Sequence, residues 1–186
     1  MTRFEIESTP IAGLSIIRRN RQIDDRGFLE RLFEEEPFSH LLNGEPVVQM
    51  NHTHTKKRGT VRGLHCQLPP HAEWKIVTCV RGSVFDVVVD LRGHSNTFGE
   101  WWGYEINDIN GDSIAIPKGC AHGLQSLQDN VDLIYMHTEE YAPIAEAAIN
   151  PFNSSLAVRW PLEVSEISKR DQSETRTLDW FKGVDW

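Results

Sequence analysis

The chain has no excess of basic charge. Its 186 residues include 19 lysines and arginines against 27 aspartates and glutamates, which gives a formal net charge of -8. Binding to nucleic acid depends on a positively charged face that neutralises phosphates, so this balance argues against a nucleic-acid partner. A phosphorylated small molecule remains compatible, because a few arginines can form a local anion site on an acidic protein.

Cysteines and long apolar runs are also scarce. The three cysteines, Cys66, Cys79 and Cys120, form no Cys-x-x-Cys pair, and we expect them to be buried, reduced thiols. No segment approaches the roughly 20 consecutive apolar residues that span a bilayer, and the first residues lack the apolar region of a signal peptide. The sequence therefore predicts a cytoplasmic protein with no membrane partner.

Short segments rich in Val, Ile, Phe and Trp, separated by Gly, Pro, Asn and Asp, predict β-strands along most of the chain. The expected strands are 13–19, 46–52, 60–67, 75–80, 83–91, 101–106, 113–116, 132–137 and 157–160. Segments 76–80 and 83–90 flank Arg81-Gly82, which predicts a hairpin between them. Helices are expected only near 34–42 and within 164–180.

Many short strands with little helix predict an all-β fold, a jelly roll or small barrel. The length is typical of one domain, and we expect a single domain over residues 1–186. Within it, residues 1–45 would form an N-terminal arm and strands, 46–161 the jelly-roll core, and 162–186 a C-terminal tail. Alternating βα units are not expected, because there are too few helical segments to cover a parallel sheet.

Two segments are similar to the signature segments of cupin barrels. The second signature matches at every glycine, proline and histidine position, in Gly111-x5-Pro117-x-Gly119-x2-His122. The first keeps His65, but Gln67 stands where metal-binding cupins have a second histidine and Lys75 where they have a glutamate. A cation at a ligand position repels a divalent ion, so we expect no metal at this site.

A longer set of motifs narrows the resemblance. It comprises Asp24-Asp-Arg-Gly-Phe-Leu-Glu30, Gln49-Met-Asn-His52, Arg62-Gly-Leu-His-Cys-Gln67, Lys75-Ile-Val, Asp86-Val-Val-Val-Asp-Leu-Arg92, Ile116-Pro-Lys-Gly-Cys-Ala-His-Gly123, Tyr135, Tyr141-Ala-Pro143 and Trp160-Pro161. In this order, over residues 20–171, they resemble the dTDP-4-dehydrorhamnose 3,5-epimerase family. The resemblance implies a homodimeric, cupin-like jelly-roll isomerase that epimerises a nucleotide-linked 4-keto-6-deoxy sugar without metal or cofactor.

The same resemblance implies catalytic roles for four residues. His65 would be the base that removes a proton beside the ketone, and Asp171 the carboxylate that orients it. Lys75 would hold the enolate oxygen, since an ammonium inside a barrel requires a negative partner. Tyr135 would return a proton to the opposite face of the carbon.

Seven further positions match substrate contacts of the family. Arg26 and Arg62 would bind the diphosphate, whose oxygens suit planar guanidinium groups. The others, near the nucleoside or the sugar, are Glu30, Gln49, Asn51, His122 and Tyr141. The family also places the arm carrying Arg26 and Glu30 in the neighbouring subunit, so the expected homodimer would exchange arms.

One feature of the strand conflicts with these roles. A regular strand alternates its side chains, so Arg62 and His65 should lie on opposite faces. Gly63 between them could host a bulge that turns both toward one face.

The chain departs from the family pattern around the expected site. Pro151 stands at a tryptophan position, Asn153 at an acidic one, and Cys66 at an aromatic one. The Asp-x-Arg-Gly segment is one residue short, and the loop from Asn51 to Arg62 is one residue longer. A related sugar, or epimerisation at C3 or C5 alone, therefore stays open.

Three other functions remain open from the sequence. A cupin 3,4-ketoisomerase would move the carbonyl along the sugar ring, and a binding protein would hold the nucleotide sugar without proton exchange. A metal-dependent oxygenase would use His65, His71, Glu73 and His122 as ligands.

Overall fold

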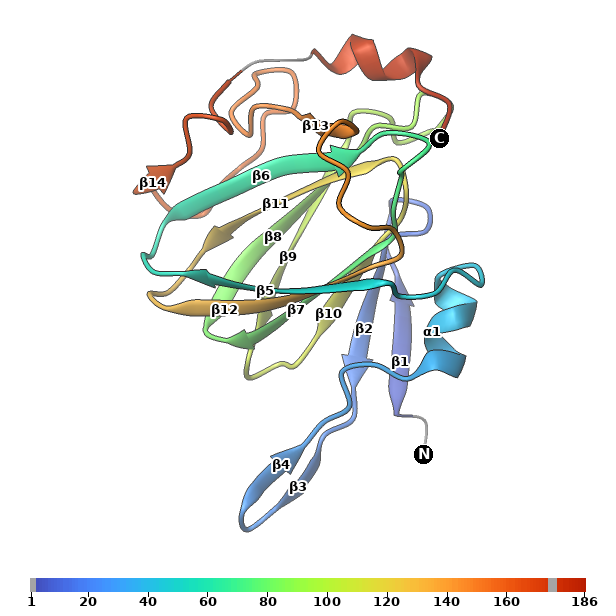
Figure 1. Ribbon diagram of the computed structural model, residues 1–186. Coiled ribbons are helices and arrows are strands. Elements are labelled where there is room, and N and C mark those ends of the chain that lie inside the picture. The colour runs from blue at the N-terminus through green and yellow to red at the C-terminus, as the bar shows by residue number, and fades with distance from the viewer. Residues whose placement is uncertain (1–2, 174–176) are drawn as a thin grey trace.

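Two β-sheets face each other and form the body of the protein (Figure 1). The computed structural model describes residues 3–173 and 177–186. One sheet has the strand order β1-β2-β10-β7-β12-β5, and the other β13-β6-β11-β8-β9 with β14 beside β6. The strands are β1 (Phe4–Ser8), β2 (Ser15–Arg19), β3 (Gln22–Asp24), β4 (Gly27–Leu29), β5 (Gln49–Thr55), β6 (Thr60–Gln67), β7 (Lys75–Arg81), β8 (Ser83–Asp90), β9 (Trp101–Asn107), β10 (Ser113–Ile116), β11 (Cys120–Ser126), β12 (Val131–His137), β13 (Glu146–Ala148) and β14 (Glu166–Ile167). This arrangement confirms the expected all-β, cupin-like barrel.

The inner faces of the two sheets share an apolar core. Val77 of β7 and Leu133 of β12 pack in the same cluster as Val88 of β8 and Leu124 of β11. All four are at most 1% exposed. Facing sheets stabilise each other by removing such side chains from water, and this burial defines the walls of the barrel.

Part of each outer face is also covered, which explains why several strands are apolar on both sides. Helix α1 (Glu35–Leu41) packs Phe38 against the first sheet, beside Ile17 of β2. The 3-10 helix η1 (Leu178–Gly183) packs Phe181 against the second sheet, beside Leu64 of β6. The helix expected near 34–42 is thus confirmed.

The expected hairpin over 76–80 and 83–90 is wrong. β7 pairs with β10 and β12 in the first sheet, whereas β8 pairs with β9 and β11 in the second. Gly82, with φ +80°, is the single residue between the two strands. The chain therefore crosses from one sheet to the other at this turn instead of folding back on itself.

Other local predictions also need correction. Residues 157–160 form no strand, although Val158 and Trp160 pack against the second core cluster. In the described part of 164–180 there is no α-helix; β14 lies there, and η1 begins at Leu178. Positions 174–176 of that range lie outside the described residues.

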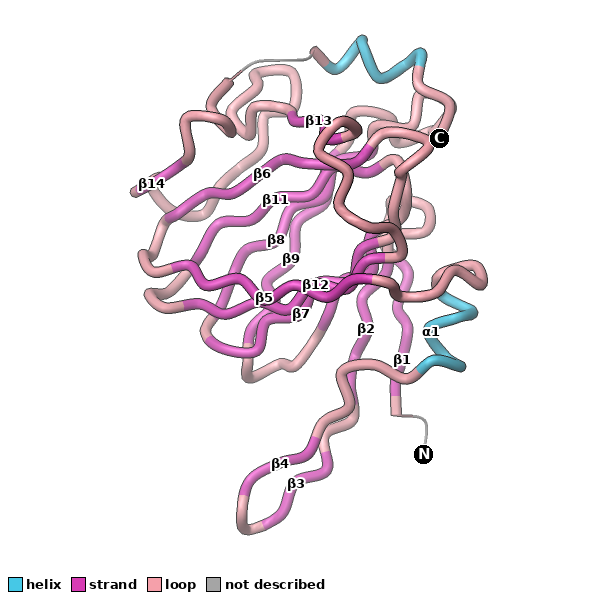
Figure 2. The backbone as a smooth tube through the Cα atoms, in the orientation of Figure 1, coloured by secondary structure: helices cyan, strands magenta, loops and turns pink. Residues whose placement is uncertain are grey.

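A two-stranded hairpin of β3 and β4 projects from the barrel (Figure 2). Its apolar side chains face solvent in the isolated chain: Ile23 is 79% exposed, Phe28 57% and Leu29 62%. Elsewhere Cys66, Cys79 and Cys120 are buried thiols outside any disulfide, as expected. Among the described residues, no helix is long and apolar enough to cross a membrane.

Replacing Gly82 tests the crossing between the sheets. A Cβ at this position would lie 3.0 Å from Cγ2 of Val131, and its φ is unfavourable for any L side chain. We expect Gly82→Ala to lower the free energy of unfolding by about 1–2 kcal/mol, measured by urea denaturation. Gly183→Ala is the control, because nothing lies within 4 Å of its Cβ position. Equal stability of the two variants would contradict this account of the turn.

Candidate active site

A pocket of about 470 Å³ opens between the two sheets. Its lining residues are Asn51, Thr53, Arg62, Gly63, His65, Lys75, His122, Gly123, Leu124, Tyr135, His137, Ser168, Arg170 and Asp171. The four expected catalytic residues and three of the expected substrate contacts are among them. A hollow of about 720 Å³ adjoins the pocket between β6 and the C-terminal tail and shares Arg62, Ser168 and Asp171 with it.

A bulge in β6 turns Arg62 and His65 into the same pocket. His65 lies opposite His122 of β11, and Arg62 lies opposite Leu124, so two residues of β6 face Gly123 alone. A Cβ on Gly63 would lie 2.5 Å from the carbonyl oxygen of His122, which requires glycine there. The bulge predicted from the sequence is therefore present, and it resolves the conflict of strand alternation.

His65 is paired with Asp171 from the C-terminal tail. Nε2 of His65 lies 2.7 Å from Oδ1 of Asp171, and Oδ2 accepts a hydrogen bond from the N–H of Gly63 at 3.2 Å. Burial alone would raise the pKa of Asp171, but the hydrogen bond and charge of His65 and the N–H of Gly63 outweigh it and lower that pKa. A carboxylate on Nε2 leaves Nδ1 as the nitrogen able to accept a proton.

A second carboxylate–imidazole pair lies deeper. Nε2 of His122 is 2.7 Å from Oδ2 of Asp86, and both side chains are buried. Burial raises the pKa of Asp86, against the opposing charges of His122 and Lys75. No hydrogen-bond partner of Oδ1 of Asp86 lies among the described residues.

Tyr135 lines the pocket from the opposite sheet. His65 stands on β6, whereas Tyr135 stands on β12 of the other sheet, so the two side chains belong to facing walls. Burial raises the pKa of Tyr135 well above its ordinary value, and the negative charge of Asp86 raises it further. The phenol therefore remains a proton donor throughout the neutral range.

Lys75 stands at the end of the pocket next to a carboxylate. Its side chain is 14% exposed, and Nζ lies 3.4 Å from Oε1 of Glu73. The second oxygen of Glu73, Oε2, is 2.9 Å from Nδ1 of His137. Burial alone would raise the pKa of Glu73, but the hydrogen bond to His137 and the charge of Lys75 outweigh it and lower that pKa.

Sequence reasoning missed His137, and it considered Glu73 only as a metal ligand. Glu73 lies just before β7, and His137 is the last residue of β12. The alternation of side chains along a strand could have indicated both residues. His137 is two residues from Tyr135 and so shares its face, and Glu73 precedes Lys75 by two. Arg170 was also missed, although it directly precedes Asp171 and lines the pocket.

A cavity of about 110 Å³ continues from the pocket. Gln49 and Tyr141 line it, together with Asn51 and Glu146. The hydroxyl of Tyr141 donates to Oε2 of Glu146 at 2.9 Å, and its backbone N–H donates to Oε1 of Gln49 at 3.0 Å. Gln49 and Tyr141, two of the residues expected near the nucleoside or the sugar, thus lie beside the pocket.

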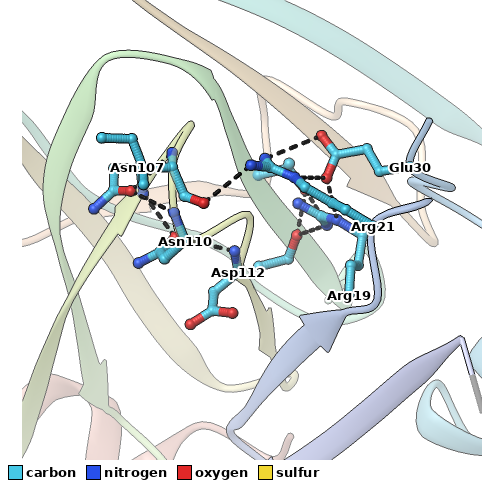
Figure 3. A network of polar contacts seen from close by, with 9 residues as sticks. Arg19, Arg21, Glu30, Asn107, Asn110 and Asp112 are labelled. Carbon is cyan, nitrogen blue, oxygen red and sulfur yellow. Dashed lines mark hydrogen bonds and ion pairs between the residues drawn. The ribbon is translucent and has the colours of Figure 1, made fainter. Parts of the chain in front are cut away.

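Arg26 and Glu30 are not at the pocket of their own chain. Arg26 lies at the tip of the β3–β4 hairpin, 89% exposed, with Asp24 as its ion-pair partner. Figure 3 shows Glu30 beside Arg21 and Arg19, with Oε2 2.9 Å and 3.4 Å from their Nε atoms. Within one chain, the structure therefore separates these two residues from the other expected contacts.

Of the four residues of the metal-dependent alternative, His65 and His122 line the pocket, whereas His71 and Glu73 are not among its lining residues. His71 pairs with Glu139, and Glu73 is held by His137 and Lys75. Within the ranges 3–173 and 177–186, no group of three or more His, Cys, Asp or Glu side chains is placed to hold a metal ion.

Comparison with known proteins identifies the family. The family model described as dTDP-4-dehydrorhamnose 3,5-epimerase matches residues 8–179. The chain belongs to the dTDP-4-dehydrorhamnose 3,5-epimerase family. It is 36% identical over 157 residues to the dTDP-4-dehydrorhamnose 3,5-epimerase of Shigella flexneri, a match that covers 84% of this chain and 86% of that protein.

Solved structures of the family share the fold. The dTDP-6-deoxy-D-glucose-3,5-epimerase of Legionella pneumophila, in complex with dTDP-4-keto-L-rhamnose, matches with a TM-score of 0.85 and 36% identity over 90% of this chain and 89% of that one. ChmJ of Streptomyces bikiniensis, a 3'-monoepimerase in complex with dTDP-quinovose, matches with a TM-score of 0.86 and 31% identity over 93% of this chain and 87% of that one. The family resemblance of the sequence is thus confirmed.

The raised pKa of Tyr135 is open to direct measurement. We expect its phenol to ionise above pH 10, later than an exposed tyrosine, because burial and Asp86 disfavour the phenolate. Absorbance at 295 nm during alkaline titration should lose its latest-ionising component in Tyr135→Phe. A wild-type and a variant curve that differ only below pH 10 would contradict the assignment.

Proposed function

We propose that the chain epimerises a dTDP-linked 4-keto-6-deoxy sugar at C3, C5 or both, by proton transfer through an enolate. One observation carries this proposal. An imidazole backed by a carboxylate, His65 with Asp171, and a protonated phenol, Tyr135, line facing walls of one pocket that also holds the Lys75 ammonium.

Inversion next to a ketone is energetically demanding. If the carbon acid is weaker than imidazolium by about a dozen pKa units, the site must offset on the order of 16 kcal/mol. A general base typically contributes only about 10²- to 10⁴-fold, so most of the barrier has to be lowered by charge at the enolate oxygen. Lys75 is the group we assign to that oxygen.

The proton balance is simple. Nδ1 of His65 takes the proton from the carbon while the C–H electron pair moves into the enolate, whose oxygen carries the negative charge beside Lys75. Asp171 stabilises the imidazolium that results. The phenol of Tyr135 then gives its proton to the opposite face of the carbon, and the enolate returns to a ketone.

The rest of the pocket fits a nucleotide. The guanidinium groups of Arg62 and Arg170 are cations suited to a diphosphate. Asn51 and His122 adjoin the sugar in this proposal, with Gln49 and Tyr141 beside the nucleoside. The assignment comes from the family resemblance, and the places of these residues in the pocket and in the cavity that continues it support it.

We further propose a homodimer that exchanges its N-terminal hairpins. The exposed Ile23, Phe28 and Leu29 of the hairpin need a partner surface, and Arg26 at its tip is not among the residues that line the pocket of its own chain. Placed against a second chain, the hairpin would bring Arg26 and Glu30 to that chain's nucleotide. The protein would then act in the cytoplasm as a single-domain subunit of this dimer.

Deuterium wash-in tests the reaction. With the dTDP-4-keto sugar in deuterated buffer, we expect label at C3, C5 or both, read by mass spectrometry and proton NMR. His65→Ala should slow wash-in by about 10²- to 10⁴-fold because the base is lost, while dTDP binding measured by calorimetry persists. Asp171→Asn should slow it as well, because the neutral amide no longer stabilises the imidazolium.

The same experiment separates the alternatives. A ketoisomerase would give a product with its carbonyl at C3, and a binding protein would retain dTDP without any wash-in. Normal turnover by His65→Ala would show that another group is the base.

Hybrid dimers test the exchanged arm. Homodimers of Arg26→Ala, which lack the diphosphate contact, and of His65→Ala, which lack the base, should each be nearly inactive. If the arms cross, mixing and reassembly should restore about a quarter of wild-type activity, because half of the dimers then contain one intact site of two. Arms that serve their own chain would leave the mixture inactive.

A further inference from the structure

Glu73 is an unexpected neighbour for Lys75, the residue whose ammonium we assign to the enolate oxygen. Its carboxylate lies 3.4 Å from the Lys75 ammonium, and the two side chains are only 10% and 14% exposed. Opposite charges attract strongly where little water screens them. An unrestrained carboxylate would therefore compete with the substrate oxygen for the ammonium.

His137 restrains this carboxylate. Its Nδ1 lies 2.9 Å from Oε2 of Glu73, and its Nε2 lies 3.3 Å from Nδ2 of Asn51. Since the amide NH₂ of Asn51 can only donate, Nε2 accepts and Nδ1–H donates to Glu73. The imidazole is also stacked on the ring of Tyr135, with centroids 6.2 Å apart and planes at 13°. It is thus fixed in both tautomer and orientation.

We propose that His137 is a positioning residue for Lys75: by binding Oε2 of Glu73, it holds the carboxylate back and leaves the ammonium directed at the substrate. The inference rests on the proposed epimerase function. The distances support it, because the carboxylate lies closer to the imidazole, at 2.9 Å, than to the ammonium, at 3.4 Å.

The arrangement differs from the other two carboxylate–imidazole pairs of the pocket. Asp171 and Asp86 each stand behind an imidazole, His65 or His122. Glu73 instead lies between an imidazole and an ammonium, so a change at His137 alters the partner of Lys75. This geometry predicts that a substitution of Glu73 suppresses the effect of a substitution of His137.

The test compares His137→Ala with the double variant Glu73→Gln/His137→Ala, by wash-in at varied substrate concentration. In the single variant, Glu73 draws the ammonium toward itself, and we expect kcat to fall about 10- to 100-fold, as for other small displacements of a catalytic group. The KM and the Kd for dTDP should stay within about twofold, because contacts remote from the reacting carbon persist. Adding Glu73→Gln should recover most of the lost kcat, because a neutral amide no longer competes.

Further variants separate positioning from stability. His137→Asn places an amide donor near the position of Nδ1 and should recover most of the activity lost in His137→Ala. His71→Ala removes a partly exposed carboxylate–imidazole pair outside the pocket, with Glu139 at 3.2 Å, and should leave kcat unchanged. If His137→Ala does not fold by circular dichroism, His137→Leu, with and without Glu73→Gln, replaces it.

Two results would overturn the inference. One is a double variant as slow as His137→Ala alone, since the carboxylate would then not be the competitor. The other is independent of activity: ¹⁵N NMR of the ligand-free protein should show a protonated Nδ1 and an unprotonated Nε2 on His137, and the opposite tautomer contradicts the proposal. Absence of wash-in by the wild type would instead reject the proposed function, while the NMR result still decides the placement of His137.

Discussion

A charge inside an apolar barrel is stable only next to an opposite charge or a hydrogen-bond partner, and this constraint organises the whole pocket. Three imidazoles lie there, each against its own carboxylate: Asp171, Asp86 or Glu73. The pairs hold the ionisable groups in place. Among the carboxylates, the pKa is lowered for Asp171 and Glu73, whose partners outweigh the effect of burial, and raised by burial for Asp86.

The partners come from distant parts of the chain. Asp171 reaches His65 from the C-terminal tail, a separation of 106 residues in sequence. The tail is bound to the barrel by the parallel pairing of β14 with β6 and by η1, whose Phe181 is buried among residues of the second sheet. A segment that the sequence suggests is a charged, solvated end of the chain therefore supplies Asp171 to the proposed active site.

Much of the barrel could be predicted from the sequence, because each strand is a local pattern. The bounds of 60–67 and 113–116 agree with β6 and β10, and the bulge at Gly63 followed from the conflict between Arg62 and His65. The pairing of strands was less accessible. A short turn such as the one at Gly82 normally indicates a hairpin. Here β7 and β8 each pair with strands distant in sequence, in different sheets, and these pairings are not visible in the local sequence pattern.

The site was predictable to the extent that the family resemblance located it. One pocket does contain the four expected catalytic residues, His65, Lys75, Tyr135 and Asp171. Without the family resemblance, the sequence pattern would not have predicted that Asp171 pairs with His65. The pair of Glu73 and His137 was missed, since neither lies in a motif and they are 64 residues apart. The contact expected of Arg26 and Glu30 is with the nucleotide of a second chain, and neither residue lines the pocket of its own chain.

His65 and Tyr135, the proposed base and acid, lie on facing sheets, and this separation has a consequence for the steps between catalytic cycles. An inversion that begins with neutral His65 and protonated Tyr135 ends with an imidazolium on one wall and a phenolate on the other. The free protein must exchange protons with water to restore its starting form. An epimerase that inverts two carbons in one visit has to complete this recovery around a bound sugar, whereas one that inverts a single carbon can recover after release. The access of water to these two walls therefore helps to decide how many centres are inverted before the product leaves.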